Sequence, residues 1–190
     1  MARPRTFEEG RAVESAMRAF WEAGYEGTST QDLCAATGLG RSSIYNTFAS
    51  KHDLFEKALR HYMDSRIATL TELMDAGLPV KEKVRTVLRW AVEPEPGEPP
   101  GCLVVNSLIE LGPHDPEIAA LLERHNADQR RLVRSALEIA ISRGEIDRDK
   151  DPLALAYFVF ATVSGMRVAA CGGADRAALE AIANTALSVF

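Results

Sequence analysis

The sequence predicts an all-α protein of about nine helices. Apolar residues recur at helical spacing along most of the 190 residues, and no segment of convincing length alternates as a half-buried strand does. Gly-Pro and Gly-Gly pairs separate the periodic segments and act as helix stops, while capping residues mark several starts. We expect helices at about 7–23, 30–37, 51–75, 80–92, 102–111, 115–143, 152–171 and 174–190, with one more short helix beginning at residue 41.

Two of these helices frame the N-terminal part of the chain. The helix at 7–23 carries an inward stripe of Val13, Met17 and Phe20 and is expected to end at Gly24. The helix at 51–75 is long enough to join two domains mechanically. Its inward residues are Leu54, Phe55, Ala58, Leu59 and Tyr62, followed by Ile67 and Leu70.

Between these two helices lie two short ones, joined by a glycine-bearing turn. Ser29 and Asp32 form a capping box at the start of the first short helix. Leu33 and Ala36 are expected to face inward, and Gly38 to end the helix with a positive φ. Two short helices joined in this way are the layout of a helix-turn-helix.

The second short helix has one apolar face, made by Ile44 and Phe48, and its other faces are polar. Because polar residues on so short a helix need a partner other than the core, the pattern indicates a DNA reader. An arginine can bind guanine O6 and N7, an asparagine can bind adenine N6 and N7, and hydroxyl and lysine side chains suit base edges or phosphates. The predicted DNA-binding residues are Thr30, Arg41, Ser42, Ser43, Tyr45, Asn46, Thr47 and Lys51. Each of these residues taken alone is interpreted as a solvated surface residue. Their combination on two short helices joined by a turn favours DNA binding.

Residues 8–55 resemble the N-terminal domain of the TetR family of transcriptional repressors. The resemblance is carried by Phe20, Gly24, Tyr25, Thr28, Asp32, Leu33, Gly38, Ile44, Tyr45, Phe48, Ser50 and Lys51. It implies a helix-turn-helix domain at 1–50 and a helical ligand-binding and dimerisation domain at 51–190. It also implies a homodimer that holds a double-stranded DNA operator until an unidentified small-molecule effector binds the second domain. Gly40 departs from the pattern, because relatives often carry a serine there that can contact phosphate.

The last two helices are the predicted dimer surface. One stripe near the C-terminus consists of Leu179, Ile182, Ala183, Ala186 and Leu187, and the segment 153–163 is apolar nearly all round. An intermolecular four-helix bundle would bury both, and an intramolecular core is the competing explanation. Two copies about 34 Å apart would read a palindromic operator.

A ligand site is predicted where polar or amphipathic groups interrupt apolar helices. The candidates are Trp90, Cys102, Asn106, Glu110, His125, Gln129, Tyr157 and Arg167. Each has a plainer interpretation: His125 as a satisfied core or exposed histidine, Trp90 as a core residue, and Arg167 with Glu110 as a buried ion pair. No metal site or cofactor is expected, since the three cysteines form no C-x-x-C pair.

Cys102 is considered separately, because it follows a proline-rich segment and opens a helix. The positive end of a helix dipole favours the reactive thiolate there. A repressor that senses oxidants or electrophiles through Cys102 is therefore an alternative function, although an ordinary buried thiol is the preferred interpretation.

Charge and hydropathy argue for a cytoplasmic protein. The formal net charge of −5 excludes a generally basic coat for nucleic acid, and residues 1–51 alone are neutral overall. Arg3 and Arg5 are either a short basic arm for DNA or an ordinary soluble terminus. The N-terminal residues have no apolar stretch of the signal-peptide kind. The longest charge-free apolar run, 153–166, has 14 residues and is expected to be too short to span a bilayer.

Other function classes have little support. No catalytic triad, phosphate-binding glycine loop or paired-carboxylate motif is present in the sequence, so we expect no enzyme. A helical protein-interaction module would use the same amphipathic helices and is the less favoured alternative. The expected mechanism is a population shift, in which a ligand displaces the helix at 51–75 and changes the spacing of two recognition helices.

Overall fold

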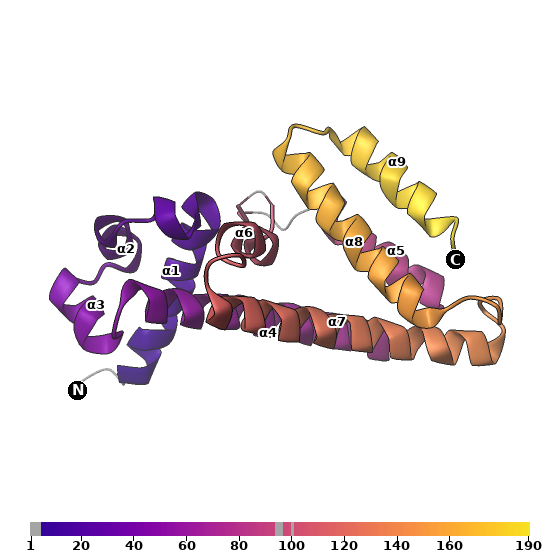
Figure 1. The fold of residues 1–190 in the computed structure, drawn as a ribbon, viewed down its shortest axis with the longest axis horizontal. Coiled ribbons are helices and arrows are strands. Elements are labelled where there is room, and N and C mark those ends of the chain that lie inside the picture. The colour runs from indigo at the N-terminus through magenta and orange to yellow at the C-terminus, as the bar shows by residue number, and fades with distance from the viewer. Residues whose placement is uncertain (1–4, 94–96, 100) are drawn as a thin grey trace. The chain divides into compact units, whose positions relative to one another are not determined.

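The computed structural model describes residues 5–93, 97–99 and 101–190, with side-chain surroundings from residue 9 onward. Within these ranges the chain forms nine α-helices and no strand, which confirms the predicted fold class (Figure 1). The helices are α1 (Arg5–Gly27), α2 (Thr30–Thr37), α3 (Arg41–Thr47), α4 (Lys51–Asp75), α5 (Val80–Val92), α6 (Leu103–Glu110), α7 (Pro116–Arg143), α8 (Pro152–Cys171) and α9 (Arg176–Leu187). Helices α2, α4, α5 and α8 have the bounds expected from the sequence.

The described residues divide into two compact units. The first unit contains the described residues up to Ser65 together with Cys102–Leu122, and the second contains those of Arg66–Gly101 together with Glu123–Phe190. Both α4 and α7 therefore contribute residues to both units. These are units of packing, and the functional division at residue 50 stays a prediction.

Helix starts follow the predicted capping chemistry. Ser29 Oγ accepts a hydrogen bond from Asp32 N, and the Asp32 carboxylate accepts one from Ser29 N at 2.8 Å, so the capping box is confirmed. The hydrogen bond from the Ser29 side chain is the largest cause that lowers the pKa of Asp32. Gly38 ends α2 with a φ of 69°, as expected. Asp115 Oδ1 accepts from Ile118 N at 3.0 Å at the start of α7.

The core of the first unit gathers the inward faces of α1 to α4, α6 and the start of α7. Phe20 is completely buried, with its ring edge-on to Phe55 at 5.0 Å. Met17 is only half-buried, and Ala36 is exposed rather than inward as predicted. The reason is that α2 has only eight residues and packs one narrow face on α1, with Leu33 buried at its centre.

Helix α1 does not end at Gly24 as predicted. Gly24 breaks the helical conformation with φ 76° and ψ 174°, and one further helical turn follows to Gly27. The sequence signal therefore marks a kink. Arg3, Pro94, Pro96 and Pro100 lie outside the described residues, as does the side chain of Arg5.

The core of the second unit buries most of the stripe that was predicted to form the dimer surface. Its residues Leu179, Ala183, Ala186 and Leu187 lie in one cluster with apolar residues of α5 and α8. Only Ile182 of the stripe is exposed, at 39%. The competing explanation, an intramolecular core, therefore holds for this face of α9.

Helix α8 is longer than the charge-free run 153–166, which was expected to be too short to span a bilayer. The helix has 20 residues and is long and apolar enough to cross a membrane by length and composition alone. A single helix of this kind is weak evidence, because a helix of a soluble protein passes the same test. Only 22% of its apolar window is buried within the chain.

Candidate nucleic-acid interface

Helix α3 has the two faces that a recognition helix requires. Ile44 and Phe48 are buried in the first core, so they fix how the helix lies. The remaining surface is polar and accessible: Arg41, Ser42, Ser43, Tyr45 and Asn46 are exposed, and Thr47 is half-buried. The structure therefore places six of the eight predicted DNA-binding residues on one short helix.

The other two predicted residues flank this helix. Thr30 is the first residue of α2, and its hydroxyl lies 3.0 Å from Tyr45 Oη, which links the start of α2 to the second half of α3. The guanidinium carbon of Arg41 lies 5.9 Å from the centre of the Tyr45 ring. These contacts hold the Tyr45 side chain between Thr30 and Arg41.

Lys51 lies at the first turn of α4 with its ammonium 4.4 Å from the centre of the Tyr25 ring. That ring packs against Phe55 at 5.0 Å and stacks on Phe20 at 6.2 Å. Burial is the main cause that raises the pKa of Tyr25, and the carboxylates of Glu26 and Asp115 add to it. The aromatic cluster thus holds Lys51 at the edge of the candidate DNA surface.

Gly40 is the N-cap of α3, and no side-chain cap bond is present there. Its φ of −69° is ordinary for any residue, and a Cβ would meet nothing within 4 Å. The departure from the family pattern therefore has no steric cause in this chain.

The candidate ligand residues are divided between the two units. Cys102, Asn106 and Glu110 belong to the first unit, and Trp90, His125, Gln129, Tyr157 and Arg167 to the second. Each member of the suggested ion pair has a partner within its own unit: Glu110 accepts hydrogen bonds from backbone amides of α1, and Arg167 donates to the Gly101 carbonyl at 2.9 Å. His125 is buried and has an interaction partner. Cys102 is the half-buried N-cap of α6, with Sγ 3.6 Å from Tyr62 Oη.

Two of the candidates share a hollow of about 200 Å³ between α7 and α8. Its lining is Asn126, Gln129, Arg130, Tyr157, Phe160, Ala161 and Ser164. The Arg130 guanidinium lies 4.7 Å from the centre of the Tyr157 ring and pairs with Glu123 at 2.8 Å. The sequence reasoning missed Asn126, Arg130 and Ser164, although their helical spacing from Gln129 and Tyr157 could have indicated them.

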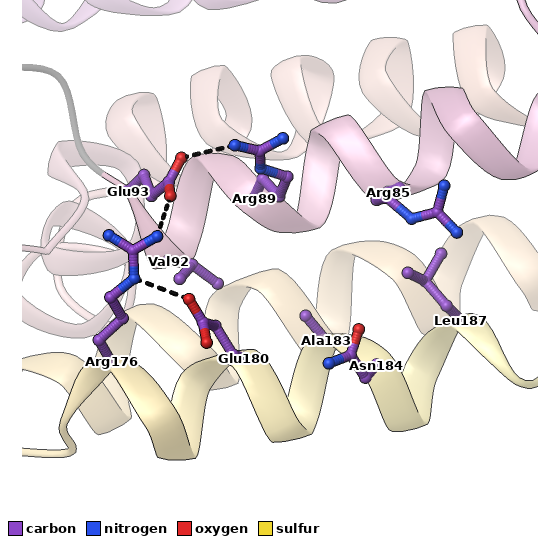
Figure 2. A pocket seen from close by; sticks show the side chains of 9 residues that line it. All are labelled: Arg85, Arg89, Val92, Glu93, Arg176, Glu180, Ala183, Asn184 and Leu187. Carbon is purple, nitrogen blue, oxygen red and sulfur yellow. Dashed lines mark hydrogen bonds and ion pairs between the residues drawn. The ribbon is translucent and has the colours of Figure 1, made fainter.

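A second hollow of about 240 Å³ lies between α5 and α9 (Figure 2). A chain of ion pairs crosses it from Arg89 through Glu93 and Arg176 to Glu180, with Arg176 Nε 2.7 Å from Glu180 Oε1. The hydrogen bond that Glu93 accepts from Arg89 is the main cause that lowers the pKa of Glu93, and the hydrogen bond that Arg176 donates to Glu180 is the main cause that raises the pKa of Arg176. Because these charged groups already bind one another, we interpret them as a structural link between α5 and α9.

Helix α8 exposes a row of large apolar side chains. They are Leu153, Tyr157, Phe158 and Val168, with exposed fractions of 40%, 52%, 38% and 52%. Ile182 of α9 is exposed as well.

Among the residues described from 9 onward, no group of histidine, cysteine or carboxylate side chains is arranged to hold a metal ion.

Comparison with known proteins agrees with these features. Residues 12–58 match the family described as "Bacterial regulatory proteins, tetR family", and residues 80–186 match "Tetracyclin repressor-like, C-terminal domain". The uncharacterized HTH-type transcriptional regulator YezE of Bacillus subtilis (strain 168) is 33% identical over 193 residues, covering 100% of both chains. The HTH-type transcriptional repressor ComR of Escherichia coli (strain K12) is 34% identical over 195 residues, covering 99% of this chain and 91% of ComR.

Solved structures give the same result. A cysteine mutant of the TetR family transcriptional regulator CifR, complexed with a 26-base-pair operator, has a TM-score of 0.84 and 31% identity, with 100% of both chains covered. A TetR family regulator from Cytophaga hutchinsonii has a TM-score of 0.89 at 21% identity, covering 100% of this chain and 96% of that one, which shows the shared fold.

Proposed function

Because the chain belongs to the TetR family of bacterial transcriptional regulators, we propose that it represses transcription from a palindromic operator and that a small molecule releases it. The observation that carries the proposal is the accessible polar surface of α3, held by two buried residues on its other side. A helix of this kind fits the major groove of DNA. As is typical of this family, we place the regulator in the cytoplasm and assign it no catalytic activity.

The direct test is selection of binding sites from random duplexes with the full-length protein. We expect a single palindromic consensus, bound with an affinity that falls as salt rises. Small molecules are then screened for release of the selected duplex. Failure to enrich any sequence would contradict the proposal.

Different segments of the chain carry different parts of the proposed function. We assign contact with DNA to residues 1–50 and effector binding with dimerisation to residues 51–190. Arg41 and Asn46 read bases, as do Ser42 and Thr47, whereas Thr30, Ser43, Tyr45 and Lys51 contact phosphates.

The Lys51 assignment predicts a sequence-independent effect. Lys51→Ala should weaken binding to the selected operator and to an unrelated duplex by the same factor. The slope of log affinity against log salt should fall by about 0.9, because one phosphate contact is lost. Titrations at several salt concentrations measure both quantities. Lys81→Ala, which removes an exposed lysine of α5, is the matched control and should leave the slope unchanged.

A homodimer accounts for the exposed row on α8. Large apolar side chains that stay accessible along one helix of a soluble regulator are best explained by a partner surface. A lone recognition helix reads only a short site, so a palindrome needs two copies. We therefore assign the dimer interface to the row of α8 and to Ile182 of α9.

The dimer proposal predicts that a charge in this row separates the copies. Phe158→Glu should shift the protein from dimer to monomer in analytical ultracentrifugation and weaken operator binding strongly, while its circular dichroism stays native. Ile139→Glu is the matched control, since Ile139 is also exposed, at 51%, but lies on α7. A Phe158→Glu protein that remains a dimer would refute the assignment.

The effector is assigned to the hollow between α7 and α8. Asn126 and Gln129 of α7 and Ser164 of α8 are half-buried polar groups in its lining, and Tyr157 and Phe160 of α8 supply aromatic surface. Such a mixture suits a flat molecule with hydrogen-bonding groups. None of the remaining predicted ligand residues, Trp90, Cys102, Asn106, Glu110, His125 and Arg167, lines this hollow or the one between α5 and α9. Release follows when the effector shifts α4, which carries Lys51 at its start.

Sensing through Cys102 has weaker support than effector binding. The thiol packs against the first core, and its neighbour at 3.6 Å is the Tyr62 hydroxyl. A partly buried cysteine in such surroundings behaves as a small packing residue. We therefore retain small-molecule release as the function.

A further inference from the structure

Glu110 makes an unusual connection between α6 and the kink of α1. Its two carboxylate oxygens accept hydrogen bonds from the backbone amides of Tyr25 and Glu26, at 2.9 and 2.8 Å. These two residues directly follow the break at Gly24, where helical hydrogen bonding is interrupted. The carboxylate thus caps the short turn after the kink as an N-cap residue would, but from 84 or 85 residues away along the chain.

Gly24 is matched to this carboxylate. Its φ of 76° favours glycine, and a Cβ at this position would lie 3.0 Å from Glu110 Oε2. Both the backbone conformation and the absence of a side chain at Gly24 therefore favour this position of the carboxylate against the two amides.

The kink leads directly into the helix-turn-helix. Thr28 follows it, almost fully buried, and its hydroxyl donates to the Gly24 carbonyl at 2.6 Å. Ser29 then caps α2. The ring of Tyr25, whose amide Glu110 holds, lies beneath the Lys51 ammonium. The Glu110 carboxylate therefore fixes both the backbone that leads into α2 and the Tyr25 ring that lies beneath the Lys51 ammonium.

The same segment also holds the exit of the helix-turn-helix. Asp115 Oδ2 lies 2.6 Å from His52 Nε2 in the first turn of α4, while Asp115 Oδ1 caps α7. Glu110 and Asp115 thus contact the chain on both sides of α2 and α3. We name these two contacts, Glu110 with the Tyr25 and Glu26 amides and Asp115 with His52, the α6–α7 clamp.

We propose that Glu110 is a positioning residue for operator recognition: through the α6–α7 clamp it holds the α1 kink in the geometry that presents α3 to DNA. The inference rests on the proposed function. It makes α6, which precedes the effector-binding helices in the chain, part of the DNA-reading unit. A displacement of α6 would then loosen α2 and α3 without any contact between Glu110 and DNA.

The test compares Glu110→Gln with Glu22→Gln in the full-length protein. Glu22 is an exposed residue of α1, so both variants lose one negative charge from the first unit and gain the same general attraction to DNA. Affinity is measured for the selected operator and for an unrelated duplex at one salt concentration. Amide exchange of Tyr25 and Glu26 is followed by NMR without DNA.

Glu110→Gln should lower operator affinity about tenfold relative to Glu22→Gln, because charge-assisted hydrogen bonds to two amides are weakened. Affinity for the unrelated duplex should match between the two variants, and exchange should accelerate at Tyr25 and Glu26. Equal operator affinity in the two variants would overturn the proposal, as would an equal loss on both duplexes, since a merely structural defect lowers both. A wild-type chain that prefers no duplex overturns the proposed function instead, and the exchange rates still report whether Glu110 holds the amides.

A second variant covers the case in which Glu110→Gln does not fold. His52→Ala removes the other half of the α6–α7 clamp and leaves the Asp115 cap of α7 in place. It should also lower operator affinity more than affinity for the unrelated duplex. Equal effects on the two duplexes would count against the α6–α7 clamp.

Discussion

Alanine in place of Phe20 is expected to lower the free energy of unfolding of the first unit by about 3–5 kcal/mol. The ring is completely buried and contacts both Phe55 and Tyr25. Its removal leaves a cavity that the neighbouring helices cannot close, because α1 and α4 are held by the rest of the same core. The loss is a large part of the stability of an ordinary domain.

Urea denaturation followed by Trp21 fluorescence measures this effect. Trp21 is buried and directly follows Phe20 in the sequence. A Trp90→Phe background removes the tryptophan fluorescence of the second unit. Met17→Ala is the control: the side chain lies on the same helix but is half-buried, so we expect a loss of about 1 kcal/mol. A Phe20→Ala protein as stable as Met17→Ala would show that the core is not built around this ring.

The sequence predicted those features that have a local chemical cause. The bounds of α2 follow from the Ser29 cap and from Gly38, and α8 begins at the proline after Asp151, whose side chain accepts hydrogen bonds from Leu153 N and Ala154 N. The two faces of α3 follow from the spacing of Ile44 and Phe48. In each case the signal and the structure lie within a few residues of each other.

Features that depend on distant parts of the chain were not predictable in this way. The apolar stripe of α9 indicated that one face is covered, but periodicity does not say whether the cover is α5 of the same chain or a second copy. Gly24 signalled the end of a helix, yet a further helical turn follows it and is held by Glu110, which no local pattern connects with it. Glu110 itself looked like a ligand residue or half of an ion pair, because a polar residue on an apolar helix has the same sequence pattern in each role.

Replacing both Arg41 and Asn46 with alanine is expected to erase most of the sequence preference of the protein. Each bidentate contact with a base contributes about 1–3 kcal/mol of discrimination, so the two together contribute about 2–6 kcal/mol, which is a preference of about thirtyfold or more. Arg41→Ala alone should relax the consensus at a guanine and Asn46→Ala at an adenine. Both side chains are exposed, so neither change should unfold α3, whose place is fixed by Ile44 and Phe48.

Repeating the site selection with each variant distinguishes base reading from phosphate binding. The Arg41 and Asn46 variants should enrich sequences that are degenerate at one position in each half-site, whereas Lys51→Ala should enrich the wild-type consensus with a lower yield. Gln31→Ala removes an exposed polar side chain of α2 outside the assigned contacts and is expected to leave the consensus unchanged. An Arg41→Ala, Asn46→Ala double variant that still selects the wild-type site would mean that the free face of α3 does not read the bases. Recognition would then have to come from the shape of the operator alone.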